Sequence, residues 1–384
     1  MEISIAAKSF PFSGVRKMFE KASLYDDAIN MALGEPCFVT PKPIIEAGIE
    51  HLLQGKTKYA ANAGIFPFRE AIAEKLQIKN GIKCSPDNII VTFGAVEAIM
   101  LAMITLVNPG DEVIIPDPAW PDYMGQVKMV HGIPVGAKVS EENEFRMTAD
   151  IIEPLITPKT KMIIINSPNN PTGAVLNRDE LREIAELVKR HKVYVISDEP
   201  YERLIYDNEE HVSLASFDGL EDYILTINTF SKTYAMTGWR LGYACANRDI
   251  ISNMTKLQEN NGSCVNEAFQ YAGIYALKNG DKDVEYMLGC YKKNRALIVG
   301  GINQLKGFSC LVPKGAFYVF PKITELGMNS DDAADFILEK THVVTSPGIA
   351  FGAAGEGHIR ISFANDYNTI EKALDRMKRY FGTK

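Results

Sequence analysis

Polar side chains follow three consecutive apolar runs of the chain, and their types could carry out chemistry. Ser167-Pro-Asn-Asn-Pro-Thr-Gly173 follows the first run, Asp198-Glu-Pro-Tyr201 the second and Thr229-Phe-Ser-Lys232 the third. Taken singly, each has a structural explanation, since Asn-Pro-Thr-Gly is typical of turns and Asp can cap a helix. Together they supply an amide, a carboxylate, a phenol, hydroxyls and an amine. Because ligands of open α/β sheets bind beyond the carboxyl ends of the strands, the pattern predicts one polar ligand site.

The elements that must position these residues alternate between short apolar runs and helical patterns. The runs have the continuous apolar character of strands buried on both faces of a parallel sheet. They cover residues 88–93, 112–116, 161–166, 193–198 and 223–228. Helical periodicity lies at residues 67–79, 96–107 and 178–191, the last with Asn177 as its expected N-cap. This order predicts a doubly wound, mostly parallel α/β sheet.

The last third of the chain has a different character and predicts a smaller α+β domain. A long helical stretch at about 248–306 is followed by β runs at 308–313 and 316–323, a helix at 331–340, a β run at 358–364 and a helix at 369–381. We expect an N-terminal arm at 1–44 packing on the small domain, a large ligand-binding domain at 45–280 and the small domain at 281–384.

Composition excludes several classes of protein. Of 384 residues, 46% are apolar and 23% charged, which is ordinary for a globular, water-soluble chain. Forty-one Lys and Arg against 48 Asp and Glu give a net charge of -7, which argues against nucleic acid as a partner. The six cysteines form no CxxC pair and the histidines lack metal-ligand spacing, so neither a disulfide framework nor a metal is expected. The scattered cysteines fit a reducing cytoplasm, which is the expected location. No apolar run approaches the about 20 residues that span a bilayer, so no membrane partner is expected.

The order and spacing of the motifs resemble those of class I aminotransferases, the fold-type-I pyridoxal-phosphate enzymes. Besides the three motifs above, the resemblance rests on Gly34-Glu-Pro36, Tyr59, Gly94-Ala-Val96, the frame Met-Thr-Gly-Trp-Arg-Leu-Gly around Arg240, and Gly357-His-Ile-Arg360-Ile-Ser362. It covers nearly the whole chain. The overall sequence is most similar to those of the aspartate and aromatic aminotransferases of bacteria and archaea.

The resemblance implies pyridoxal 5'-phosphate as cofactor and assigns four residues to its reactive part. Lys232 would bond covalently to the cofactor aldehyde and, once displaced, move the proton of the substrate α-carbon. Asp198 would keep the pyridine nitrogen protonated, so that the ring withdraws electrons. Asn170 and Tyr201 would hydrogen-bond the phenolic oxygen. For Tyr201 a packed aromatic is the alternative interpretation.

The cofactor phosphate needs several donors, which the start of a helix can supply. The backbone N–H groups at Gly94, Ala95 and Val96 precede or open an expected helix. The resemblance adds Ser231, Thr229 and Arg240 as phosphate ligands, and Arg240 is the strongest of them because of its charge. Many members have Gly in place of Thr229, so the role of its hydroxyl is the least determined. Tyr59 matches the tyrosine that reaches the phosphate in the neighbouring subunit, which implies a homodimer with shared sites. A buried hydrophobic tyrosine is its rival interpretation.

Besides Asn170, which is implied in substrate binding as well, three further residues are implied on the substrate side. Trp120 matches the aromatic residue that stacks on the cofactor ring, with a core tryptophan as the alternative. Arg360 resembles the arginine that clamps the substrate α-carboxylate with its planar fork. Gly34 would line the same carboxylate site. Substrate binding to Arg360 would pull the small domain closed over the cofactor.

The choice of substrate is less determined. We expect transfer of the amino group of an L-amino acid, aspartate or aromatic and broad in range, to a 2-oxo acid such as 2-oxoglutarate by a ping-pong mechanism. Region 260–266 has no arginine and position 96 is Val, where two aspartate subgroups carry a cation. Lys or Arg residues of the first 20 positions, such as Arg16, are another source of one. A carbon–sulfur β-lyase on the same scaffold and, more distantly, a non-catalytic ligand-binding or regulatory protein stay as alternatives.

Overall fold

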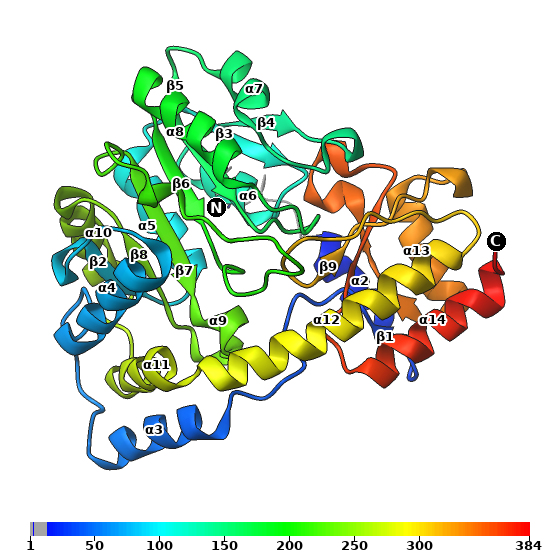
Figure 1. The fold of residues 1–384 in the computed structure, drawn as a ribbon, viewed down its shortest axis with the longest axis horizontal. Coiled ribbons are helices and arrows are strands. Elements are labelled where there is room, and N and C mark those ends of the chain that lie inside the picture. Colours follow the sequence, from blue (N-terminus) through cyan, green and yellow to red (C-terminus); the bar gives the residue numbers. More distant parts are fainter. Residues whose placement is uncertain (1–2, 4–13) are drawn as a thin grey trace.

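A seven-stranded sheet forms the centre of the computed structural model, which describes residue 3 and residues 14–384 (Figure 1). The strand order is β2-β8-β7-β6-β5-β3-β4. Every neighbouring pair is parallel except those of β8, which runs antiparallel to β2 and to β7. The bounds are β2 Ile89–Thr92, β3 Glu112–Asp117, β4 Ile133–Lys138, β5 Thr160–Asn166, β6 Tyr194–Asp198, β7 Ile224–Thr229 and β8 Gly242–Cys245. The mostly parallel sheet predicted from the sequence is therefore confirmed.

All five predicted strands of this sheet exist, and two strands were not predicted. Edge strand β4 has the sequence Ile-Pro-Val-Gly-Ala-Lys and is mostly half-buried or exposed, so it lacks the apolar run of a central strand. Strand β8 is only four residues long and begins with Gly242. Short or exposed strands leave little hydrophobic pattern in the sequence, since their stability comes from pairing with a neighbour.

Helices cover both faces of the sheet, as a doubly wound fold requires. Successive residues of a strand point to opposite faces. Val113 and Met162 therefore share a core with α5 (Ala95–Leu106), whereas Ile114 and Ile163 share one with α8 (Arg178–His191). The other helices of this part are α3 Lys42–Leu53, α4 Phe66–Asn80, α6 Asp122–Met129, α7 Ala149–Ile152, α9 Phe230–Thr233, α10 Arg248–Asn261 and α11 Glu267–Asn279. The predicted cap of α8 is present, because the Asn177 side chain accepts from the N–H groups of Asp179 and Glu180.

The C-terminal part is a smaller α+β unit joined to the large sheet by one long helix. Helix α12 (Asp281–Gln304) runs from beside α9 and α11 toward α13 and α14 (Figure 1). The remaining bounds are β9 Tyr318–Val319, β10 Val343–Val344, β11 Ser346–Pro347, β12 Ile359–Ser362, α13 Ser330–Thr341 and α14 Tyr367–Phe381. Strands β11, β12 and β9 form an antiparallel three-stranded sheet.

Two predictions for this part were too simple. The expected helical stretch at 248–306 is three helices, α10 to α12, because Gly262 and Gly280 end α10 and α11. The expected β run at 308–313 is an irregular segment whose ladder contact is a single bridge between Ser309 and Lys322. Leu311 is 42% and Val312 48% exposed, so these apolar residues have no core to join.

The described residues of the N-terminal region pack on the C-terminal part. Strand β1 (Ile29–Asn30) pairs in parallel with β10, and helix α2 spans Gly14–Ala22. Met18 and Ala32 share a small core with Ala334, Leu338 and Val344. The domain boundaries at 44/45 and 280/281 stay predictions. In the described ranges no helix combines the length and the apolar character that crossing a membrane would need.

Candidate active site

A cavity of about 390 Å³ lies at the carboxyl ends of β5, β6 and β7. It is lined by the predicted residues Gly34, Ala95, Val96, Trp120, Asn170, Asp198, Tyr201, Thr229, Ser231, Lys232, Arg240 and Arg360. The structure thus brings together residues more than 300 positions apart in the chain. Gly94 lies next to the cavity, since a Cβ there would meet the Arg240 guanidinium at 2.7 Å. Tyr59 does not line it and is 89% exposed.

Asp198 is a buried carboxylate with one oxygen left free. It ends β6 and is 3% exposed. The Tyr123 hydroxyl donates to Oδ2, whereas Oδ1 is buried without a hydrogen-bond partner. Burial raises the pKa of Asp198 to about 7, opposed by the Tyr123 hydrogen bond and increased by the charge of Glu199. A cationic N–H group placed at Oδ1 would satisfy this oxygen and restore the charged form.

Lys232 lies in α9, directly after β7, with its amine inside the cavity. Nζ donates to the backbone oxygen of Gly34 at 2.6 Å. Burial lowers the pKa of this lysine to about 8; Glu35 opposes the shift, and Arg360 and Arg240 add to it. An amine with such a pKa is present in part as the neutral nucleophile near neutral pH.

Arg360 on β12 is held by two aromatic rings and by hydrogen bonds from its two terminal nitrogens. Its guanidinium lies between two aromatic rings, 4.5 Å from the centre of Tyr318 and 4.6 Å from that of Phe351. Nη1 donates to Asn170 Oδ1 at 2.9 Å and Nη2 to the backbone oxygen of Ala32 at 2.5 Å. Nε is buried and has no partner. The charge is therefore fixed in position and keeps capacity for an anion.

Tyr201 and Gly34 both meet Tyr318, on the same side of the cavity as Arg360. The hydroxyls of Tyr201 and Tyr318 lie 3.0 Å apart. Burial raises the pKa of Tyr201 well above its ordinary value, so its hydroxyl stays a donor. A Cβ at Gly34 would lie 2.2 Å from the Tyr318 hydroxyl oxygen, which explains why glycine is needed there.

A group of donors gathers where α5 begins. The first backbone N–H groups of a helix have no partner within it, and Gly94 precedes α5 with a φ of 83°. Arg240 donates to the backbone oxygens of Thr237 and Phe93. Thr229 caps α9 by accepting from the Ser231 N–H. Its hydroxyl also donates to the backbone oxygen of Leu241 at 3.1 Å. The Thr229 side chain thus connects the start of α9 to the residue before β8.

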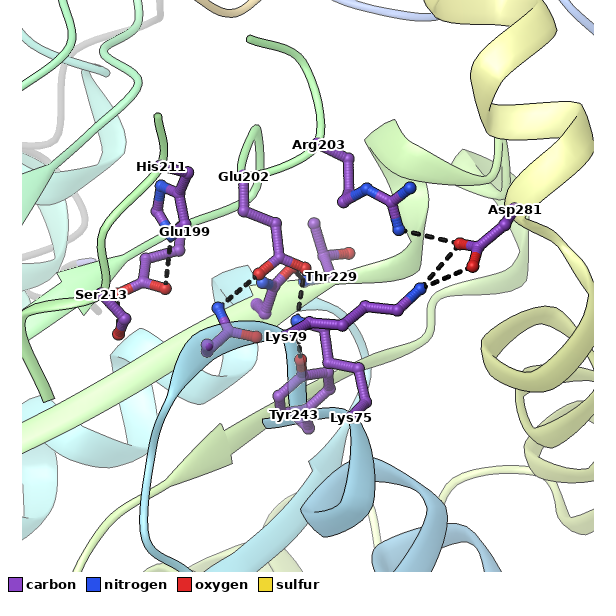
Figure 2. A network of polar contacts seen from close by, with 12 residues as sticks. Lys75, Lys79, Glu199, Glu202, Arg203, His211, Ser213, Thr229, Tyr243 and Asp281 are labelled. Carbon is purple, nitrogen blue, oxygen red and sulfur yellow. Dashed lines mark hydrogen bonds and ion pairs between the residues drawn. The ribbon is translucent and has the colours of Figure 1, made fainter. Parts of the chain in front are cut away.

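A buried polar network supports the segment that carries Asp198 and Tyr201. Their neighbours Glu199 and Glu202 are not among the residues that line the cavity and belong instead to the network of polar contacts drawn in Figure 2. Glu199 accepts from Ser197, from Ser213 and from His211, and Glu202 pairs with Lys75 and accepts from Asn80. Burial opposes ionisation of Glu202, but Lys75 and His211 outweigh it and hold its pKa below the ordinary value.

The same network includes three potential metal ligands. Ligand atoms of Glu199, Glu202 and His211 lie within 4.8 Å of one another. Burial would lower the pKa of His211, but Glu199 outweighs it and raises the pKa. Lys75 forms an ion pair with Glu202, and His211 lies 3.0 Å from Glu199, so each carboxylate already has a basic partner.

Sequence reasoning missed several residues that line the cavity. They are Pro121, Asp122, Tyr123, Asn166, Pro200, Thr237, Tyr318 and Phe351. Tyr123 is the second residue of α6 and packs edge to face on Trp120, which lies before the helix, so helical spacing gave no signal for it. Tyr318 and Phe351 sit in apolar stretches that read as core, so only the tertiary structure places them beside Arg360.

The chain is similar to a known family over nearly its whole length. Residues 26–377 match the model of the family described as aminotransferase class I and II. The aspartate aminotransferase of Pyrococcus abyssi is 44% identical over 370 residues, which cover 96% of this chain and 95% of the relative. The aromatic-amino-acid aminotransferase 2 of Thermococcus litoralis is 41% identical with the same coverage. The solved structure of Thermus thermophilus aspartate aminotransferase with maleate matches with a TM-score of 0.94 and 35% identity over 99% of both chains.

We predict that Lys75→Met destabilises the protein by roughly 3–5 kcal/mol, because it leaves the Glu202 carboxylate buried without its cation. The double variant Lys75→Met/Glu202→Gln should recover part of this loss. Chemical unfolding followed by circular dichroism measures both. Equal stability of Lys75→Met and the wild type would contradict the role of the pair.

We predict that Asp198→Asn raises the melting temperature of the cofactor-free protein at pH 8. The pKa of about 7 lies above the unfolded value, so the native state holds the extra proton and stability falls as pH rises between about 4 and 7. The asparagine has no charge to bury, and the difference should shrink toward pH 4. Differential scanning fluorimetry measures it, with the exposed Asp375→Asn as control. A lower melting temperature at pH 8 would refute the buried charge.

Proposed function

The chain belongs to the class I and II aminotransferase family, and on that basis we propose how its cavity transfers an amino group with pyridoxal 5'-phosphate. The observation that carries the proposal is the Asp198 carboxylate, whose Oδ1 is buried without a partner. It fits the protonated pyridine nitrogen of the cofactor. Arg240, Ser231 and the start of α5 fit the phosphate, and Asn170 and Tyr201 the phenolic oxygen. Lys232 fits the aldehyde.

When bound, the cofactor supplies an aldehyde that carries the amino group and a ring that accepts electron density from the substrate α-carbon. The protein's own residues do the rest. The lowered pKa of Lys232 lets its amine take the proton from the substrate α-carbon and deliver it to the carbon at which the cofactor would carry the amino group. The ionised Asp198 stabilises the positive charge opposite Oδ1, and Tyr201 stays a hydrogen-bond donor. Trp120 forms a wall of the cavity.

Arg360 is the proposed site of the α-carboxylate. It is 4% exposed, and its Nε is without a partner. A planar guanidinium matches a planar carboxylate. Because amino acids and 2-oxo acids share this carboxylate, both bind at the same place in alternating order. This supports a ping-pong mechanism.

We propose a broad amino-acid range that includes aromatic substrates, with 2-oxoglutarate as acceptor. The cations lining the described cavity are Lys232, Arg240 and Arg360, and each has a role given above. Val96 stands in the wall, so the described lining offers no further cation for a distal carboxylate. The side chain of Arg16 lies outside the described residues. Aspartate is included in this range if Arg16, or another Lys or Arg of the first 20 positions, meets its distal carboxylate.

We also propose a homodimer with shared sites. Tyr59 is 89% exposed and lies outside the cavity of its own chain, as expected of a residue that serves a neighbouring site. Leu53, at 85%, and Phe66, at 54%, are exposed on either side of it in the chain. Burying such side chains is favourable. The cytoplasmic location stays a prediction.

The first test is a visible-absorbance titration of the cofactor-loaded protein with aspartate, glutamate, tyrosine, phenylalanine, alanine and cystathionine. We expect the cofactor band to disappear with several of these, aromatic ones included, and to return with 2-oxoglutarate. A band that persists while pyruvate accumulates would identify a β-lyase instead. A purified protein without a cofactor band would refute the proposal.

For the shared site, we predict that Tyr59→Phe lowers cofactor retention on dialysis, since it removes a hydroxyl donor to a phosphate, and leaves the melting temperature of the cofactor-free protein unchanged. Sedimentation velocity should give a dimer for both proteins. A monomeric wild type, or full retention in the variant, would contradict the role of Tyr59.

A further inference from the structure

A loop of the C-terminal part reaches across to the end of β3 in the large sheet. The loop consists of two short 3₁₀ turns, Gly348–Phe351 and Ala353–Gly355, between β11 and β12. Two hydrogen bonds join it to the last residue of β3 and to the segment that follows. The Ala119 N–H donates to the Phe351 oxygen at 2.7 Å, and the Ala354 N–H donates to Asp117 Oδ1 at 3.0 Å.

Two glycines lie against the Asp117 side chain and leave space for its carboxylate. A Cβ at Gly352 would lie 2.1 Å from Asp117 Oδ1, so only glycine lets the loop come so close. Gly352 also has a φ of 131°, which disfavours any other residue. On the other side is Gly136 of β4, where a Cβ would approach Asp117 to 3.3 Å.

Asp117 has no ion-pair partner that would explain its position. Among the described residues, no Lys, Arg or His nitrogen forms an ion pair with it within 4.0 Å. Lys138, its register partner on β4, is exposed and acts only at longer range. The pKa of Asp117 is raised because burial outweighs the Ala354 hydrogen bond and the charge of Lys138. Within the described part of the chain, the hydrogen bond to the half-buried Asp117 carboxylate comes from the Ala354 N–H of the loop. Its position is therefore explained by its contact with the loop.

Phe351, a residue of this loop, connects Asp117 to the proposed substrate site. Phe351 is 3% exposed, lines the cavity and covers one face of the Arg360 guanidinium. Three positions after Asp117 the chain reaches Trp120, another wall of the same cavity. The Asp117 side chain, together with the backbone hydrogen bond between Ala119 and Phe351, thus ties the loop that covers Arg360 to the segment that carries the tryptophan.

We propose that Asp117 is a positioning residue that latches the 348–355 loop to the end of β3, and so fixes Phe351 and Arg360 for the substrate carboxylate. The inference rests on the proposed function, because it assigns the α-carboxylate to Arg360. Asp117 itself touches no reacting atom. Its contribution is to the binding of every substrate that carries this carboxylate, amino acids and 2-oxo acids alike.

The test compares Asp117→Ala with Asp117→Asn, because the asparagine keeps an oxygen that can accept from Ala354 and the alanine does not. Asp117→Ala should raise KM for amino acid and 2-oxo acid together by roughly tenfold, the range expected for a hydrogen bond to a charged group. The kcat, the cofactor content and the cofactor absorbance should change little. Asp117→Asn should restore most of the wild-type KM. Lys138→Ala is the matched control: it removes the neighbouring charge, keeps the hydrogen bond and should leave KM unchanged.

Hydrogen exchange of the loop amides in the holoenzyme gives a readout that does not depend on turnover. Residues 348–355 should exchange faster in Asp117→Ala than in the wild type, and Asp117→Asn should resemble the wild type. An unchanged KM or unchanged exchange in Asp117→Ala would overturn the latch, as would an Asp117→Asn as impaired as the alanine variant. A wild type that reacts with no amino acid would refute the proposed function and with it the substrate role, whereas the exchange rates would still decide whether Asp117 holds the loop.

Discussion

The buried carboxylate of Asp198 is the constraint on which much of the site depends. A carboxylate at the end of a buried strand is costly unless its oxygens find partners. Here one oxygen accepts from Tyr123 and the other is left for a ligand. Such a carboxylate needs a rigid support, because a movement toward water would satisfy the free oxygen but remove it from the cavity.

That support comes from residues facing away from the cavity. Glu199 and Glu202 alternate with Asp198 and Tyr201 along one short segment, and each is fixed by its own set of donors (Figure 2). The segment thus has one face for a ligand and one anchored in the protein interior. Lys75 connects this anchor to α4, so helix packing and site geometry are coupled.

The proposed substrate side of the cavity depends on contacts between the two parts of the fold. Arg360 comes from β12 but donates to Asn170 after β5 and to Ala32 near the N-terminus. The loop carrying Phe351 is tied to the end of β3. A movement of the C-terminal part would therefore change the position of the arginine and of its aromatic neighbours together. Closure of the small domain on substrate binding stays a prediction.

The sequence by itself determined the central strands, the helix periodicity and most of the residues around the cavity. Buried strands leave continuous apolar runs, and the chemistry of Asn170, Asp198 and Lys232 stands at their ends. The tertiary structure alone decided what depends on contacts distant in the chain. It added β4 and β8, which are stabilised by pairing and not by their own pattern, and it placed Tyr123, Tyr318 and Phe351 against Asp198 and Arg360. Local patterns record burial and periodicity, whereas which buried aromatic faces a charged group is set only when distant segments pack.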